Sequence, residues 1–123
     1  MISHVNCVVL FVRDQQRSLD FYVDTLGWEL RTDALMSDGT RWIDVAPPRA
    51  RTRIALIAPT DGFVFPDVAA APCTLTTEDA QATFHDLKGR GVEVIEPVVE
   101  SWATYLTVTD PDGYVYVVGE NHD

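Results

Sequence analysis

The sequence predicts an α+β fold made of two copies of one module, in which a strand and a helix are followed by three strands. Short apolar runs typical of strands alternate with two segments of helical periodicity. The elements have the same order in both halves: when Glu78 is laid on Asp14, Gly91 falls on Gly27. Near the C-terminus, the segment 110–113 has the sequence Asp-Pro-Asp-Gly, which favours a turn between two antiparallel strands.

The first module is predicted to cover about residues 1–58. Its apolar run at residues 5–12 indicates a strand that is buried on both faces. Asp14 is the expected N-cap of the helix, and Gly27 stands where a helix commonly ends. Three further strands are expected at residues 28–32, 41–46 and 52–58.

The second module is predicted at about residues 73–123, after a connector at about residues 59–72. A short strand is expected at residues 74–76, and Thr76 or Thr77 is expected to cap a helix that ends around Gly89. Strands follow at residues 92–95, 105–109 and 114–119. Neither half has enough residues to fold well alone, so the sequence predicts a single domain over residues 1–123.

Composition and charge narrow the classes of protein. The 123 residues include 9 Lys and Arg against 19 Asp and Glu, a net charge of −10 that would repel a nucleic acid backbone. No apolar run approaches the roughly 18 residues that cross a membrane, and the start lacks the basic leader of a signal peptide. We therefore expect a cytoplasmic protein that binds neither nucleic acid nor membrane. Cys7 and Cys73 form neither a disulfide framework nor a zinc pattern.

Three segments carry a resemblance to a known family. They are residues 9–30, with the pattern VxFVRDxxRSLDFYxDxLGWEL, residues 91–94, GVEV, and residues 110–114, DPDGY. Together they resemble the glyoxalase/bleomycin-resistance/extradiol-dioxygenase superfamily, also called vicinal oxygen chelate. The resemblance covers nearly the whole chain. It implies that eight strands form an open cup around a small-molecule site, with the helices packed outside.

Many members of that family hold a divalent metal in the cup with one His, Glu or Gln from each of four strands. On this chain the matching positions are Cys7, Ala55, Pro72 and Val117. Three of these residues have no donor atom in the side chain, and one thiolate cannot hold Mg²⁺, Ni²⁺ or Fe²⁺ in the family's manner. The sequence therefore predicts neither a metal ion nor another cofactor.

Without a metal, the resemblance implies an apolar cavity that holds a flat, largely apolar or aromatic organic molecule. The predicted function is metal-independent binding of such a molecule, as in drug-sequestering resistance proteins, with no catalytic residue assigned. The acidic charge could also attract a cationic ligand. The residues expected to contact the ligand are Cys7, Val9, Phe11, Trp42, Ala55, Ile57, Trp102, Tyr105 and Val117.

Two alternatives remain open. The protein could be a lyase, isomerase or dioxygenase-type enzyme, with metal ligands in unusual places or with Cys7, Asp44 or Tyr105 acting as an acid or base. It could instead be an interaction module without a ligand. Family members commonly dimerise, so the resemblance also implies a homodimer.

Overall fold

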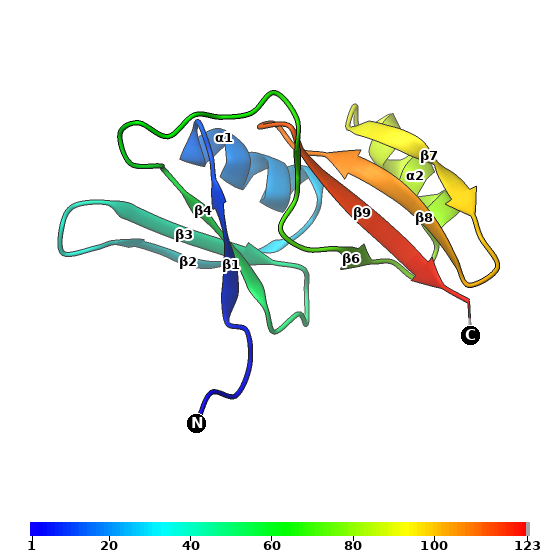
Figure 1. The fold of residues 1–123 in the computed structure, drawn as a ribbon, viewed down its shortest axis with the longest axis horizontal. Helices are drawn as coiled ribbons and strands as arrows, with labels where there is room; N and C mark the ends of the chain where they lie inside the picture. The colour runs from blue at the N-terminus through cyan, green and yellow to red at the C-terminus, as the bar shows by residue number, and fades with distance from the viewer. Residues whose placement is uncertain (123) are drawn as a thin grey trace. The chain divides into compact units, whose positions relative to one another are not determined.

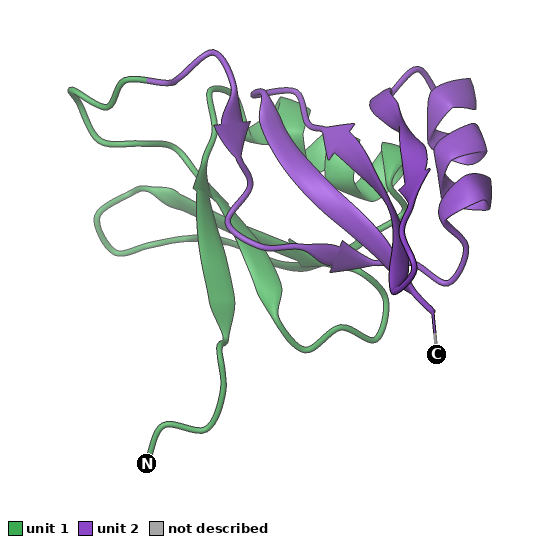
Figure 2. Cartoon of the chain, turned by 45° about the vertical axis from the view of Figure 1, so that its right-hand side comes forward, with its two compact units in different colours: residues 1–64 green, residues 65–123 purple. Residues whose placement is uncertain are grey.

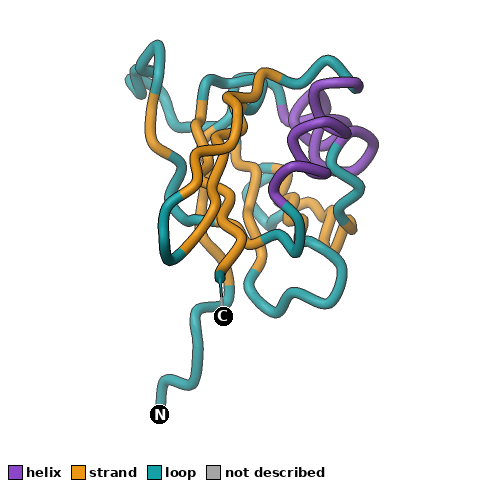
Figure 3. The backbone as a smooth tube through the Cα atoms, turned by 90° about the vertical axis from the view of Figure 1, so that its right-hand side faces the viewer, coloured by secondary structure: helices purple, strands orange, loops and turns teal. Residues whose placement is uncertain are grey.

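The computed structural model describes residues 1–122 and divides the chain into two compact units, Met1–Val64 and Phe65–Asp123 (Figure 1, Figure 2). The boundary between the two units lies inside the predicted connector. Asp123, the last residue of the predicted second module, lies outside the described residues. Strands form most of the regular structure, and the helices are short (Figure 3). The predicted α+β class and the repeated order of elements are confirmed. The single-domain organisation stays a prediction.

The first unit contains a four-stranded sheet. Its strands are β1 (Cys7–Phe11), β2 (Glu29–Leu35), β3 (Arg41–Ala46) and β4 (Arg53–Ile57), in the spatial order β1-β4-β3-β2. β1 runs parallel to β4, and the other neighbours are antiparallel. A parallel pair needs a long connection, which here contains the helix and the β2–β3 hairpin.

The helix of the first unit begins and ends where the sequence predicts. α1 (Gln15–Asp20) starts after Asp14, whose carboxylate accepts a hydrogen bond from the backbone N of Arg17 at 3.0 Å. The helix widens into a π-helical turn, η1 (Phe21–Thr25). Gly27 then takes a left-handed φ of 76°, a conformation that glycine adopts without steric cost.

The core of the first unit lies on one face of its sheet. Val9 on β1 is 46% exposed, so the expectation of a strand buried on both faces is wrong. β1 is an edge strand, and the helix packs on the other face of the sheet, so Val9 stays partly exposed. The core side chains are Leu10, Val12, Leu19, Tyr22, Ile43, Val45, Ile54 and Leu56.

The second unit contains a five-stranded sheet. The strands β7 (Glu93–Val99), β8 (Ala103–Thr109) and β9 (Tyr114–Asn121) form an antiparallel meander. Two short strands, β5 (Ala69–Ala70) and β6 (Leu75–Thr76), both pair in parallel with β9. β5 lies in the segment predicted to be the connector. The sequence does not predict this strand, because two alanines give no periodic signal that distinguishes a strand from a loop.

The second helix, α2 (Ala80–Gly89), begins later than predicted. Its N-cap is Asp79, whose carboxylate accepts a hydrogen bond from the backbone N of Ala82 at 3.0 Å. The expected cap at Thr76 or Thr77 is wrong, because Thr76 pairs with β9 and the backbone N of Thr77 still donates to a β9 carbonyl. Asp at the N-cap fills the same chemical role as threonine.

α2 contacts β7, β8 and β9 and so covers one face of the second sheet (Figure 1), and the described part of the second unit has no helix on the other face. The side chains buried between α2 and the sheet include Phe84, Leu87, Leu106, Val108, Tyr116 and Val118.

Within residues 1–122, no helix has the length and apolar character needed to cross a membrane.

Candidate functional site

The candidate site lies on the face of the second sheet that α2 does not cover. Leu106 on β8 and Val118 on β9 are buried towards the helix. Successive residues of a strand point to opposite faces, so Tyr105, Val117 and Gly119 belong to the open face. Tyr105 and Gly119 are direct partners across the β8–β9 pair, which places them side by side at the centre of that face.

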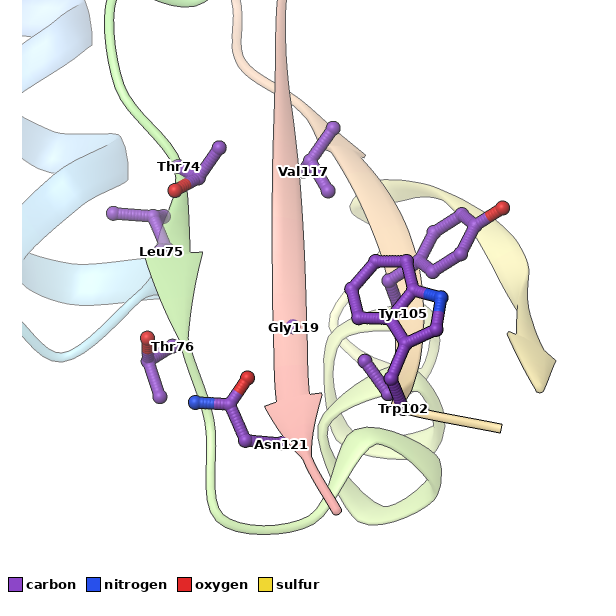
Figure 4. A pocket seen from close by; sticks show the side chains of 9 residues that line it. Thr74, Leu75, Thr76, Trp102, Tyr105, Val117, Gly119 and Asn121 are labelled. Atoms are coloured by element: carbon purple, nitrogen blue, oxygen red, sulfur yellow. The ribbon is translucent and has the colours of Figure 1, made fainter. Parts of the chain in front are cut away.

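A pocket of about 410 Å³ lies on this open face (Figure 4). Its volume is in the range of pockets that bind small organic molecules. It is built entirely from the second unit, by β6 and the residue before it, the loop before β8, and the ends of β8 and β9. The lining residues are Thr74, Leu75, Thr76, Trp102, Ala103, Tyr105, Val117, Gly119 and Asn121.

Two aromatic side chains stand on one side of the pocket. Figure 4 shows Trp102 and Tyr105 on one side of β9, with Thr74 and Thr76 on the other. Trp102 is 66% exposed, although a tryptophan usually buries most of its surface. The carbonyl oxygen of Trp102 accepts a hydrogen bond from the backbone N of His122 at 3.1 Å, which ties the loop to the end of β9. An exposed indole held in this way can stack on a ligand.

The polar side-chain groups of the pocket include three hydroxyls and one amide. They are the hydroxyls of Thr74, Thr76 and Tyr105 and the amide of Asn121, and no carboxylate, amine, guanidinium, imidazole or thiol is among the described lining groups. These groups give and accept hydrogen bonds, and the phenol of Tyr105 is the one among them that could act as an acid or base. Nearby in sequence, burial raises the pKa of the Cys73 thiol, which keeps it protonated and unreactive at neutral pH.

The remaining predicted contacts lie on one face of the first sheet. Cys7, Val9 and Phe11 on β1 alternate along the strand, and Val9 pairs directly with Ala55 on β4. Ala55 in turn pairs with Asp44 on β3, so both belong to this face. The predicted residues that share it are Cys7, Val9, Phe11, Trp42, Ala55 and Ile57.

Asp44 forms a buried polar cluster on the same face. Asp44 as a whole is 5% exposed, and its carboxylate accepts a hydrogen bond from the indole N of Trp42 at 3.0 Å. The guanidinium of Arg53 lies 3.5 Å from the other oxygen, Oδ1, and also donates to the hydroxyl of Thr32 at 3.3 Å. Within the described part of the chain Oδ1 accepts no hydrogen bond, so the ion pair with Arg53 supplies its compensation.

The structure thus places the predicted contacts in two groups. Trp102, Tyr105 and Val117 line the pocket of the second unit, and the other six lie on the first sheet. That all nine touch one ligand stays a prediction. Alternation from Tyr105 and Val117 could have found Ala103 and Asn121, whereas Thr74, Leu75 and Thr76 reach the pocket only through the parallel pairing of β6 with β9.

The four positions that match the family's metal ligands do not fit a metal ion. Ala55 offers a buried methyl group, and Val117 offers an apolar side chain to the pocket wall. Pro72 has no donor, which leaves the Cys7 sulfur as the one candidate atom of the set. Nowhere in residues 1–122 do three His, Cys, Asp or Glu side chains come close enough together to hold a metal ion.

Comparison with known proteins extends over almost the whole chain. TnmS3, an antibiotic binding protein from Streptomyces sp. CB03234, is 34% identical, with 98% of each chain covered and a TM-score of 0.86. A glyoxalase/bleomycin resistance protein/dioxygenase superfamily member from Sphaerobacter thermophilus DSM 20745 is 31% identical, with 98% of each chain covered and a TM-score of 0.90. The uncharacterized protein YetH of Bacillus subtilis (strain 168) is 31% identical over 121 residues, which are 98% of this chain and 100% of the relative.

The family model of the Glyoxalase/Bleomycin resistance protein/Dioxygenase superfamily matches residues 2–118. This match confirms the resemblance seen in the sequence. Its extent includes both units and both sheets. The chain therefore belongs to the glyoxalase/bleomycin resistance protein/dioxygenase superfamily.

Proposed function

We propose that the protein binds a small, largely apolar or aromatic organic molecule in the pocket of the second sheet, without a metal ion and without changing it chemically. The chemistry of the pocket lining carries this proposal. Two aromatic rings and several apolar side chains offer contact area, while three hydroxyls and one amide can orient a ligand. Since the described lining includes no carboxylate, imidazole, amine or thiol, and the Tyr105 hydroxyl is its one candidate acid or base, the lining favours binding over catalysis.

The relative TnmS3 supports the same function. It is an antibiotic binding protein with the same fold over 98% of both chains. Sequestration of a drug-like molecule is therefore the biological role that we infer. The predicted contacts on the first sheet, the homodimer and the cytoplasmic location belong to this proposal as well.

A second candidate function is metal-free acid/base catalysis at Asp44. The observation that favours it is the buried oxygen of this carboxylate, which accepts no hydrogen bond within residues 1–122. A base needs such a free lone pair to take a proton from a substrate. The ion pair with Arg53 weakens this candidate, because the guanidinium lies 3.5 Å from the same oxygen and already compensates its charge.

Two aromatic probes test the proposed function. Nile red is planar, neutral and more fluorescent in apolar sites, and daunorubicin is a planar aromatic antibiotic that carries a cation. Each is titrated into protein purified without a histidine tag, before and after dialysis against EDTA, and the recovered probe is analysed by mass spectrometry. We expect saturable binding of at least one probe, the same affinity with and without EDTA, and recovery of the unaltered probe.

Three results would contradict the proposal. Loss of binding after EDTA treatment, with recovery on adding one divalent metal, would show a metal-dependent site. Conversion of a probe by the wild type but not by Asp44→Asn would favour catalysis. No saturable binding of either probe would show that the pocket does not hold aromatic molecules.

A further inference from the structure

Gly119 lies in the interior of β9, at a place where the fold itself does not need a glycine. Among the seven glycines of the chain, five have a left-handed φ that favours glycine, but Gly119 does not. A Cβ atom built at Gly119 meets nothing within 4 Å, so no close approach of another protein atom excludes a side chain. Alanine would therefore fit the backbone and the surrounding space.

No irregularity of the sheet accounts for this glycine either. The β8–β9 register runs unbroken past Gly119, which pairs with Tyr105. On the other side, Gly119 pairs with Thr76 of β6, directly after the Leu75–Val118 pair. The strand therefore has no bulge at this position. A glycine inside a strand weakens it, and without a bulge or bend it often marks the close approach of a ligand or of another backbone.

Gly119 forms the floor of the pocket. In Figure 4 it lies on β9 between Thr76 on one side and Tyr105 on the other, with Trp102 beside Tyr105. Since Gly119 has no side chain, bare backbone lies between these side chains. The face of a flat ring can lie directly on such a floor, whereas a globular group touches it over a smaller area.

We propose that Gly119 is a specificity-determining residue, whose missing side chain lets a planar aromatic ring system lie against the β9 backbone beside Trp102. This inference rests on the proposed function and names the class of ligand. The rim of the pocket carries the hydroxyls of Thr74 and Thr76 and the amide of Asn121. The ligand is therefore a flat, uncharged ring system with hydrogen-bonding groups at its edge.

The variants Gly119→Ala and Gly119→Val test the inference by returning one methyl group and one isopropyl group to the floor. Gly89→Ala is the matched control, because Gly89 also lacks a left-handed φ and also has nothing within 4 Å of a built Cβ, but lies at the end of α2. Affinity for Nile red is measured by fluorescence titration. 2-Naphthol, a planar competitor, and 1-adamantanol, a globular one, are then compared in displacing it.

We expect Gly119→Ala to weaken Nile red and 2-naphthol binding roughly 10-fold, and Gly119→Val to weaken it further, because an added methyl group overfills the space of the ring. 1-Adamantanol should bind the wild type with lower affinity than 2-naphthol does. The ratio of these two affinities should be smaller in the Gly119 variants. Gly89→Ala leaves all affinities unchanged. The melting temperature of Gly119→Ala equals or exceeds that of the wild type, because alanine fits the strand better than glycine.

The possible outcomes separate the two proposals. If the wild type binds no probe, the proposed function fails and this inference fails with it. If the wild type binds and the affinity is unchanged in Gly119→Ala, the inference alone is overturned, even where Gly119→Val does not fold. If Gly119→Ala keeps its affinity but changes the oligomeric state in size-exclusion chromatography, a second copy's backbone occupies the place that we assign to the ligand.

Discussion

The variant Trp102→Ala distinguishes a tryptophan that contacts a ligand from one that supports the core. Trp102 is 66% exposed, so an indole of ordinary size leaves roughly 130 Å² available to a ligand. A ring stacked on one face would cover about half of that area. At about 25 cal/mol per Å², this contact contributes roughly 1.6 kcal/mol, or about a 15-fold change in affinity.

The same exposure predicts a small effect on stability. We expect Trp102→Ala to change the free energy of unfolding by less than about 0.5 kcal/mol. Tyr116→Ala, in contrast, removes a ring that is 0% exposed on the opposite face of β9 and should cost about 3 to 5 kcal/mol. Trp28→Phe is the control for loss of a tryptophan outside the pocket, since its ring packs on Tyr22 at 5.1 Å between centroids.

Two assays on the same preparations decide the question: Nile red titration for affinity and urea unfolding, followed by circular dichroism, for stability. Trp102→Ala should lose affinity and keep stability, whereas Trp28→Phe should keep the affinity. If Trp102→Ala lost more than about 2 kcal/mol of stability with unchanged affinity, the indole would be a core residue. The reasoning from its exposure would then be refuted.

Two further predictions concern stability. Asp79→Ala removes the N-cap of α2 and should lower the free energy of unfolding, measured in urea, by about 1 kcal/mol. Glu78→Ala, at the exposed neighbouring residue, should lower it much less. Equal decreases in the two variants would contradict the capping role. Hydrogen bonds from Arg41 lower the pKa of Asp33 from 3.8, so this pair stabilises the fold above that pH and its contribution is lost as the pH falls through the lowered value. In thermal melts at decreasing pH, the melting temperature of Asp33→Asn should fall less than that of the wild type. Equal decreases in melting temperature would exclude a contribution from this pair.

Local chemistry made most of the fold predictable from the sequence. Asp14 and Gly27 bound the first helix because capping and left-handed backbone depend on a few neighbouring residues. The start of α2 differs from the prediction because of a long-range pairing. Thr76 pairs with β9, so the N-cap of the helix is Asp79, two or three residues after the expected cap. The short strand β5 has the same explanation, since its two alanines become a strand only by pairing with β9.

The candidate site was predictable where alternation alone decides the face of a residue. Tyr105 and Val117 follow from the period of two in β8 and β9, and both line the pocket. Thr74 and Thr76 could not be found in this way, because their place beside Gly119 depends on a parallel pairing between strands far apart in sequence. Trp102 lies in a loop, where no period gives the direction of a side chain.

Val117 shows how one residue sets the chemistry of the pocket wall. The sequence resemblance matches it to the family's last metal ligand, and here it is 42% exposed in the wall of the same pocket as Trp102. A carboxylate at this position would bring a charge that needs a cation or a hydrogen-bonding partner as compensation when a ligand excludes water. Valine removes that requirement and adds surface that gains free energy on being covered. Valine therefore suits this position to apolar contact rather than to coordination, as the proposed binding of an aromatic molecule requires.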